Sequence, residues 1–309
     1  MYKVYCNKKF ENSSYIFYWD KKLFVQLTAF SGWSMLGATA NIGALQGGNI
    51  LLNLFSGVVA NASFGVATQV STAVSTFSYN LMVAFNPQII KNYSIGDTEG
   101  MFKLILRASS YSSYLILLIA IPFLLNTEVI LDLWLKDIPE YAVVFCQLMI
   151  IYQIIDVIQA PLGTLINATG KIKVYHMWLS ALLILNVPIA YYLLKMGWEP
   201  YWVLLTRVIL NFISSIIRTI HVKYLVNFPT WTYFTTVVIR FCIVTVPALG
   251  LSILMKQFCG TGISGFICNA IISVIITSAI IYLVGINKNE RALINGFITK
   301  FIRTNIKRN

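Results

Sequence analysis

Long apolar runs constrain the fold of this chain more than any other feature of its sequence. Runs of about 20 apolar residues, the length that crosses a hydrocarbon core of roughly 30 Å, can be drawn eight times. They lie near 33–55, 62–86, 112–134, 141–163, 175–194, 201–220, 234–256 and 263–286. With 58% hydrophobic and 11% charged residues, a soluble domain would be unable to bury its apolar surface. The sequence therefore predicts an all-α integral membrane protein with about eight transmembrane helices.

The distribution of Lys and Arg predicts the orientation of the chain and its partners. The net charge is +12, which raises the question of nucleic acid binding. If both termini are cytoplasmic, nineteen of the 23 Lys and Arg residues fall on the cytoplasmic side, in agreement with the positive-inside rule. Anionic lipid headgroups are sufficient partners for these charges. We therefore predict membrane lipids as partners, and no nucleic acid.

The N-terminal segment and the cysteines carry no signal of processing or metal binding. The stretch MYKVYCNKKFENSSYIFYWDKK has no uninterrupted apolar core before its lysines, so it predicts a cytoplasmic loop rather than a signal peptide. The five cysteines have neither metal-ligand nor CxxC spacing. Cys259 and Cys268, near the predicted outer face, are the two that could pair. We expect no metal and no cofactor.

The first span carries more polar side chains than a lipid-facing helix tolerates. At 100° per residue, five of them fall within an arc of roughly 140°: Ser34, Asn41, Gln46, Asn49 and Asn53. One interpretation is close helix packing at small residues, with interhelical amide hydrogen bonds worth about 0.6 to 2 kcal/mol each. Apolar residues that interrupt the stripe favour this interpretation. The alternative is a polar cavity.

Three further spans repeat polar residues on one face. A carboxylate at such a depth costs about 2.5 to 3.5 kcal/mol on insertion scales, so Asp156 requires compensation. Arg207 sits well inside its span and predicts a protein- or water-lined cavity, whereas Arg218 and His221 can also be read as interfacial residues at the cytoplasmic end. The three stripes are Gln69, Thr72, Thr76 and Asn80; Gln153, Asp156 and Gln159; and Arg207, Asn211, Ser214, Arg218 and His221.

The depths of the two central charges decide how they can interact. Counted from the predicted outer ends at ~1.5 Å per residue, Asp156 lies about 22 Å deep and Arg207 about 9 to 13 Å deep. A direct ion pair would require a tilted or broken helix. The alternative is separate roles in one aqueous cavity, and the sequence leaves both open.

Two other patterns predict local structure. Pro122, Pro188 and Pro247 fall inside predicted spans and favour kinks. Between the second and third spans, GDTEGMFKLILRASS has acidic residues first, basic residues last and an apolar face. This stretch predicts a short interfacial helix at the cytoplasmic surface.

Three loose motifs occur in an order that resembles a transporter family. They are AFNPQIIKNYSIGD (84–97), ILDLWLKDIPEYAVVF (130–145) and INATGKIKVY (166–175), in which a proline closes one span, a Trp-Leu pair the next and a Gly-Lys turn the third. They resemble the C-terminal half of Wzx-type polysaccharide flippases, which belong to the MATE-like multidrug/oligosaccharidyl-lipid/polysaccharide exporter superfamily. The resemblance runs from about residue 20 to the end of the chain.

The resemblance implies a domain organisation and a location. Residues 1–30 would be a cytoplasmic linker, 31–220 the second six-helix transmembrane lobe, 221–233 a cytoplasmic loop, 234–286 two additional helices and 287–309 a basic cytoplasmic tail. Family members carry two six-helix lobes around a central cavity, so this chain is expected to be truncated and to lack the first lobe. The implied location is a bacterial inner (plasma) membrane, with both termini in the cytoplasm.

The resemblance also implies a function. The expected activity is the movement of undecaprenyl-diphosphate-linked oligosaccharide from the cytoplasmic to the periplasmic leaflet by alternating access, without enzymatic chemistry. Amides and hydroxyls suit the sugars, Arg207 and Arg218 suit the diphosphate or acidic sugars, and a protonatable Asp156 suits coupling to an H+ or Na+ gradient. The residues expected to line the substrate cavity are Asn41, Gln46, Asn49, Gln69, Thr72, Thr76, Asn80, Gln153, Asp156, Gln159, Arg207, Asn211, Ser214 and Arg218.

Alternative functions remain open at this stage. A membrane-embedded polysaccharide polymerase or acyltransferase would need acid, base or nucleophile groups gathered at one face, and neither GxSxG nor HExxH occurs. The acidic residues that do cluster, Glu128, Asp132, Asp137 and Glu140, lie in a predicted outer loop far from both histidines. The remaining alternatives are another MATE-like exporter, an eight-helix channel and a nonfunctional remnant.

Overall fold

The computed structural model describes residues 19–260, 262–286 and 291, and the regular structure of this part of the chain is helical throughout. Seven of its helical segments are long and apolar enough to cross a membrane. The prediction of an all-α, multi-pass membrane protein is therefore confirmed at this level. The elements are α2 (Lys21–Ser94), α3 (Thr98–Leu125), α4 (Thr127–Trp134), α5 (Ala142–Thr169), α6 (Lys173–Lys195), α7 (Trp202–Val226), α8 (Thr230–Tyr233), η1 (Phe234–Ile239), α9 (Arg240–Lys256), α10 (Gly262–Ile280) and η2 (Ile281–Gly285).

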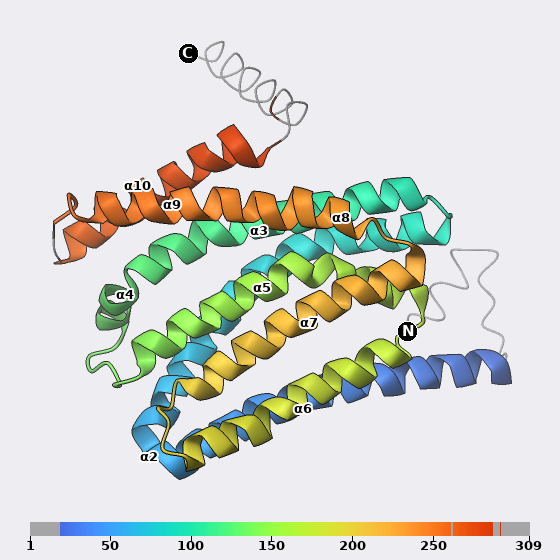
Figure 1. The fold of residues 1–309 in the computed structure, drawn as a ribbon, viewed down its shortest axis with the longest axis horizontal. Helices are drawn as coiled ribbons and strands as arrows, with labels where there is room; N and C mark the ends of the chain where they lie inside the picture. The colour runs from blue at the N-terminus through green and yellow to red at the C-terminus, as the bar shows by residue number, and fades with distance from the viewer. Residues whose placement is uncertain (1–18, 261, 287–290, 292–309) are drawn as a thin grey trace, which may run out of the picture.

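Helix α2 is bent into two arms by a single residue. Gly57 has φ 76° and ψ −169°, a conformation outside the helical region, and the chain is helical on both sides of it. The arms, 21–56 and 58–94, diverge from this bend (Figure 1). Each arm exceeds the length of about 20 residues that a membrane crossing needs. The turn that the sequence predicts between 55 and 62 is therefore present, but it consists of one glycine rather than a loop.

The Gly57 bend leads to a prediction about stability. Its φ and ψ lie in a region that is open essentially to glycine alone, although a methyl group there would meet no neighbouring atom. Gly57→Ala is therefore expected to lower the free energy of unfolding by about 1 to 2 kcal/mol through backbone strain. Thermal unfolding of the detergent-solubilised protein measures this. Gly65→Ala is the matched control, because Gly65 also has open space but lies in regular helix, where alanine stabilises by about 0.5 to 1 kcal/mol. Equal effects of the two substitutions would contradict the proposed strain.

The connections between the long helices alternate between two ends of the molecule. At one end lie the Gly57 bend, α4, the connection 196–201 and residues 257–260 after α9; at the other lie the start of α2 and the connections 95–97, 170–172 and 227–229 (Figure 1). We call these the Gly57 end and the Asp97 end. Such alternation is what successive membrane crossings require.

Helix α5 lies at the centre of the bundle and contacts α2, α3 and α7. One apolar cluster joins α2, α3, α5, α6 and α7, and includes the fully buried Leu52, Phe145 and Ile150. A second includes Ile89, Leu162 and Val222. Helices α9 and α10 pack on each other and on α3.

Small residues of α2 allow the close approach of α6. A methyl group on Gly47 would lie 2.8 Å from Val187 Cγ2, and one on Gly37 would lie 2.4 Å from His176 Nδ1. This agrees with the packing interpretation of the glycines in the first span. Gly37 and Gly47 therefore serve helix contact, and the polar residues of the same arm require a separate explanation.

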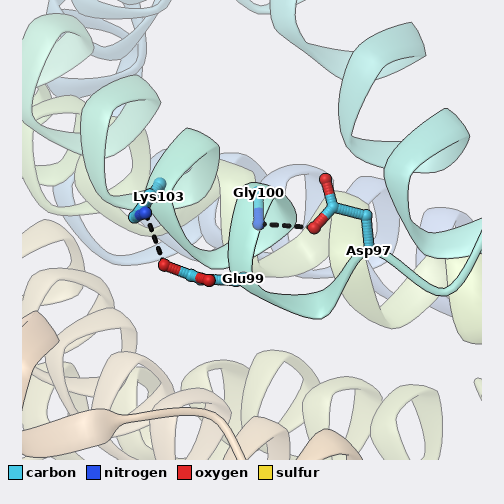
Figure 2. Close-up of polar contacts among 4 residues, drawn as sticks. All are labelled: Asp97, Glu99, Gly100 and Lys103. Carbon is cyan, nitrogen blue, oxygen red and sulfur yellow. Dashed lines mark hydrogen bonds and ion pairs between the residues drawn. The ribbon is translucent and has the colours of Figure 1, made fainter.

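The start of α3 differs from the sequence prediction. Asp97 caps the helix by accepting a hydrogen bond from the Gly100 amide at 2.9 Å, and Lys103 forms an ion pair with Glu99 (Figure 2). The helix then runs without interruption to Leu125. The prediction of a separate short interfacial helix is therefore wrong. The apolar face of the first turns of α3 is buried, as the complete burial of Met101 shows. This segment therefore continues into the bundle instead of lying on the surface of the bundle.

Other predicted boundaries shift by one or two helical turns. Pro87, expected to close a span, lies inside α2, which continues to Ser94. Helix α7 continues through the first residues of the predicted loop 221–233 and ends at Val226. The predicted span 112–134 is divided at Asn126, the residue between α3 and α4, whose side chain makes no capping hydrogen bond to α4. Its side chain donates to the carbonyl of Pro122 and to Asn269 Oδ1 on α10, and these bonds compete with helix continuation.

Candidate functional site

A cavity of about 240 Å³ lies where the first arm of α2 meets α5, α6 and α7. Its charged lining residues are Arg207 and Arg218 from α7 and Asp156 from α5. We call it the arginine cavity. Its polar neutral lining residues are Asn41, Tyr152, Asn186, Asn211 and Ser214. Four of the five residues in the stripe that the sequence predicts on α7 therefore line one cavity, and the fifth, His221, does not.

Arg218 is a buried cation with unused hydrogen-bonding capacity. Only 7% of its surface is exposed. Its Nη1 donates to the Gln159 carbonyl at a long 3.4 Å, its Cζ lies 5.6 Å from the Tyr175 ring centre, and its Nε is buried without a partner. A guanidinium carries five N–H donors. Because burying an uncompensated charge is unfavourable, this arrangement is suited to an anionic ligand.

Arg207 is held in a similar way at the other side of the same cavity. Its guanidinium Cζ lies 4.8 Å from the Tyr152 ring centre, within the range of a cation–π interaction. Nη2 donates to Asn41 Oδ1 at 3.4 Å, and Nε is buried without a partner. Asp156 also lines this cavity, but no ion pair joins its carboxylate to the Arg207 guanidinium. Arg207 and Asp156 therefore share the cavity without forming a direct ion pair, which resolves the alternatives left open by their depths.

A second cavity, of about 410 Å³, lies between the other arm of α2 and α5. We call it the amide cavity. Asn86 and Gln153 line it together with the hydroxyl residues Ser75, Thr76, Tyr79 and Thr164. Asp156 lines this cavity as well as the arginine cavity. The two cavities are therefore neighbours that share one carboxylate.

Hydrogen bonds between α5 and α7 fix the wall of the arginine cavity. Gln159, which is 1% exposed, donates through Nε2 to Asn211 Oδ1 at 3.1 Å. Asn211 donates in turn through Nδ2 to the carbonyl of Tyr152 at 3.2 Å. The Gln159 carbonyl is the acceptor for Arg218. Gln159 and Asn211 thus position the arginines by tying their helix to α5.

Eight of the fourteen predicted site residues line one of the two cavities, one stands behind a cavity wall, and five line neither cavity. Asn41, Asp156, Arg207, Asn211, Ser214 and Arg218 line the arginine cavity; Thr76, Gln153 and Asp156 line the amide cavity. Gln159 stands behind the arginine cavity. Gln46, Asn49, Gln69, Thr72 and Asn80 line neither cavity. Of these, Gln69 and Asn80 are exposed on the surface of α2, and Thr72 donates to the carbonyl of Thr68 within its own helix.

Sequence reasoning missed several lining residues. Tyr152 precedes Asp156 by four positions, the helical spacing that places two side chains on one face, so this residue was within reach of the same argument. Asn186 lies in an apolar stretch of α6, where a single amide forms no stripe. Asn86 and Thr164 form a hydrogen bond with each other, from Thr164 Oγ1 to Asn86 Oδ1 at 2.8 Å. A pairing between helices so distant in sequence leaves no periodic signal in either.

The sequence predictions also concern the cysteines and the groups that could bind a metal ion in the described residues. The four cysteines there, Cys146, Cys242, Cys259 and Cys268, are free, so Cys259 and Cys268 are not bonded. No group of three or more His, Cys, Asp or Glu residues in the described chain is arranged to hold a metal ion. At the Gly57 end, burial and the nearby carboxylates of Glu140 and Glu199 raise the pKa of Tyr141.

Comparison of the chain with protein-family models, with curated proteins and with solved structures yields no match. The fold and the cavities therefore define the class of protein by themselves. This is a multi-pass helical membrane protein with charged and amide side chains gathered inside its bundle. Such residues at membrane depth are unfavourable and mark pathways for polar substrates or ions.

Proposed function

We propose that this protein is a transporter of flippase type, which moves an undecaprenyl-diphosphate-linked oligosaccharide between the two leaflets of a bacterial inner membrane. The observation that carries the proposal is Arg218, a buried guanidinium in an intramembrane cavity with no carboxylate bonded to it. A phosphate or carboxylate group of a ligand would supply the missing charge. The motif resemblance to Wzx-type flippases supports the same class of substrate.

The chemistry of the lining favours an anionic amphiphile over a bare ion. The arginine cavity combines two guanidinium groups and several amides with leucines from α6. Arginine recognises phosphate through charge-assisted hydrogen bonds that are about twice as strong as neutral ones. Its leucines offer an apolar surface to the lipid part or to sugar C–H groups. The proposed substrate needs all three kinds of contact.

The proposed orientation places the Asp97 end in the cytoplasm. Lys91, Lys103, Lys171, Lys173 and Lys223 lie at or near this end, whereas few basic residues lie at the Gly57 end. The positive-inside rule then assigns the sidedness. In this proposal the helical bundle acts as one MATE-like lobe of the transport path, with α9 and α10 as its additional helices. Asp156 serves coupling to H+ or Na+.

Ligand binding tests this proposal most directly. The protein is placed in nanodiscs, and its affinity for an undecaprenyl-diphosphate-linked oligosaccharide is compared with its affinity for a neutral polyprenyl glycoside of equal chain length. The diphosphate lipid is expected to bind at least tenfold more tightly at moderate ionic strength, because charge-assisted hydrogen bonds contribute about 1.5 to 3 kcal/mol. Equal affinities would remove the basis for an anionic substrate.

A further inference from the structure

The amide cavity has a chemistry different from that of the arginine cavity. Its lining residues include no cation, and Asp156 is its single charged residue. Neither histidine nor cysteine lines it. A phosphate would meet no positive charge there, and a transition metal would find no imidazole or thiolate and only the single thioether of Met82. The cavity is therefore suited to a neutral, polar ligand.

Hydrogen bonds already present determine what the amides can offer. Thr164 Oγ1 donates to Asn86 Oδ1 at 2.8 Å, which leaves the two N–H donors of Asn86 available. Gln153 Nε2 donates to Ser71 Oγ at 2.8 Å, which leaves Gln153 Oε1 as an acceptor. The Asp156 carboxylate adds further acceptors. Donors from α2 thus face acceptors from α5.

The remaining lining residues add apolar surface. Val157 and Ala160 form part of the wall on α5, and Met82 and the ring of Tyr79 line the cavity from α2. A sugar ring has hydroxyl groups at its edge, each both donor and acceptor, and C–H groups on its faces. Amides and a carboxylate beside an aromatic ring and aliphatic walls match both properties. With about 410 Å³, the cavity is within the usual size range of small-molecule sites.

We propose that the amide cavity is a glycan subsite, in which Asn86, Gln153 and Asp156 bind the hydroxyl groups of an uncharged sugar ring and Tyr79 contacts its face. This inference rests on the proposed function and deepens it, because it separates the recognition of sugar from the recognition of the anionic group. The shared Asp156 places the two subsites side by side. One ligand with an anionic group and a neutral sugar can therefore occupy both.

Photoaffinity labelling tests the glycan subsite. The protein in nanodiscs is labelled with a diazirine-bearing dodecyl maltoside, and the labelled peptides are mapped by mass spectrometry. Labelling is expected at Tyr79 and Met82 and should be competed by excess unmodified dodecyl maltoside. Asn86→Ala and Gln153→Ala should each reduce it at least fivefold. Gln88→Ala is the matched control, since this amide is exposed two residues from Asn86 and should change nothing.

Two comparisons decide the outcome. A diazirine-bearing dodecylphosphocholine has a similar alkyl chain without a sugar, and equal labelling of the amide cavity by it would overturn the inference. Labelling that persists in both amide variants, with their thermal unfolding unchanged, would overturn it as well. Arg218→Met should leave maltoside labelling intact. If it does, and the diphosphate lipid shows no preferential binding, the glycan subsite stands and the flippase proposal fails.

Discussion

Replacement of Arg218 by methionine is expected to stabilise the empty protein and to weaken its binding of a diphosphate-linked lipid. The buried guanidinium has no bonded carboxylate, so its desolvation is poorly compensated in the absence of ligand. A methionine of similar length removes that cost, and the free energy of unfolding should rise by about 1 kcal/mol or more. The lost charge-assisted hydrogen bonds should reduce affinity about ten- to a hundredfold.

The opposite signs of these two effects separate a ligand-binding role from a structural one. A residue that holds the fold together loses stability when it is removed, whereas a residue kept for binding often opposes stability. Thermal unfolding and lipid binding are measured on the same preparation. Lys223→Met is the control, because it removes a cation from the exposed end of the same helix. A stability loss in Arg218→Met would indicate that Arg218 is structural.

Charge reversal at Arg207 is expected to have the largest effect on affinity. Arg207→Glu places a second carboxylate in the cavity that Asp156 already lines, and changes its side-chain charge from net positive to net negative. Repulsion of an anionic headgroup adds to the lost hydrogen bonds, so affinity should fall about a hundredfold. Titration of the diphosphate lipid in nanodiscs at two ionic strengths measures this loss and its screening.

A second substitution tests whether Asp156 and Arg207 face the same ligand. Adding Asp156→Asn to Arg207→Glu removes one of the two carboxylates, and about tenfold of the affinity should return. Residues that act on one ligand are expected to be non-additive in this way. Lys195→Glu, at the exposed end of α6, is the control for charge reversal as such. No recovery in the double variant would place the two residues in separate sites.

The sequence predicted the all-helical, multi-pass character of the chain, because membrane crossing imposes a simple rule of length and polarity. It failed at boundaries that side chains decide. Nothing in the composition near Pro87 shows that α2 continues to Ser94, because burial of Ile89 against other helices outweighs the local effect of proline. The break at Asn126 depends on a hydrogen bond to Asn269, more than a hundred residues away.

The candidate site was predictable where one helix carries it. The stripe on α7 repeats at helical spacing, so its five polar residues could be assigned to one face, and the structure places all of them except His221 along one cavity. On α2 the same reasoning assigned to the cavity some residues that do not line it. Gln69 shares a face with the cavity residue Thr76 and Gln46 lies at the far edge of the polar arc that includes Asn41, yet both are exposed and line neither cavity. Only tertiary structure separates these cases.

Asp156 borders two hollows of unlike chemistry, and this has a thermodynamic consequence. A ligand bound in one cavity changes the electrostatic field and the hydration of the Asp156 carboxylate. Because this carboxylate also lines the other cavity, the change affects a ligand bound there. By linkage, the factor by which a sugar alters the affinity for an anion must equal the factor by which the anion alters the affinity for the sugar. A single side chain thus suffices to make two adjacent binding events cooperative or antagonistic.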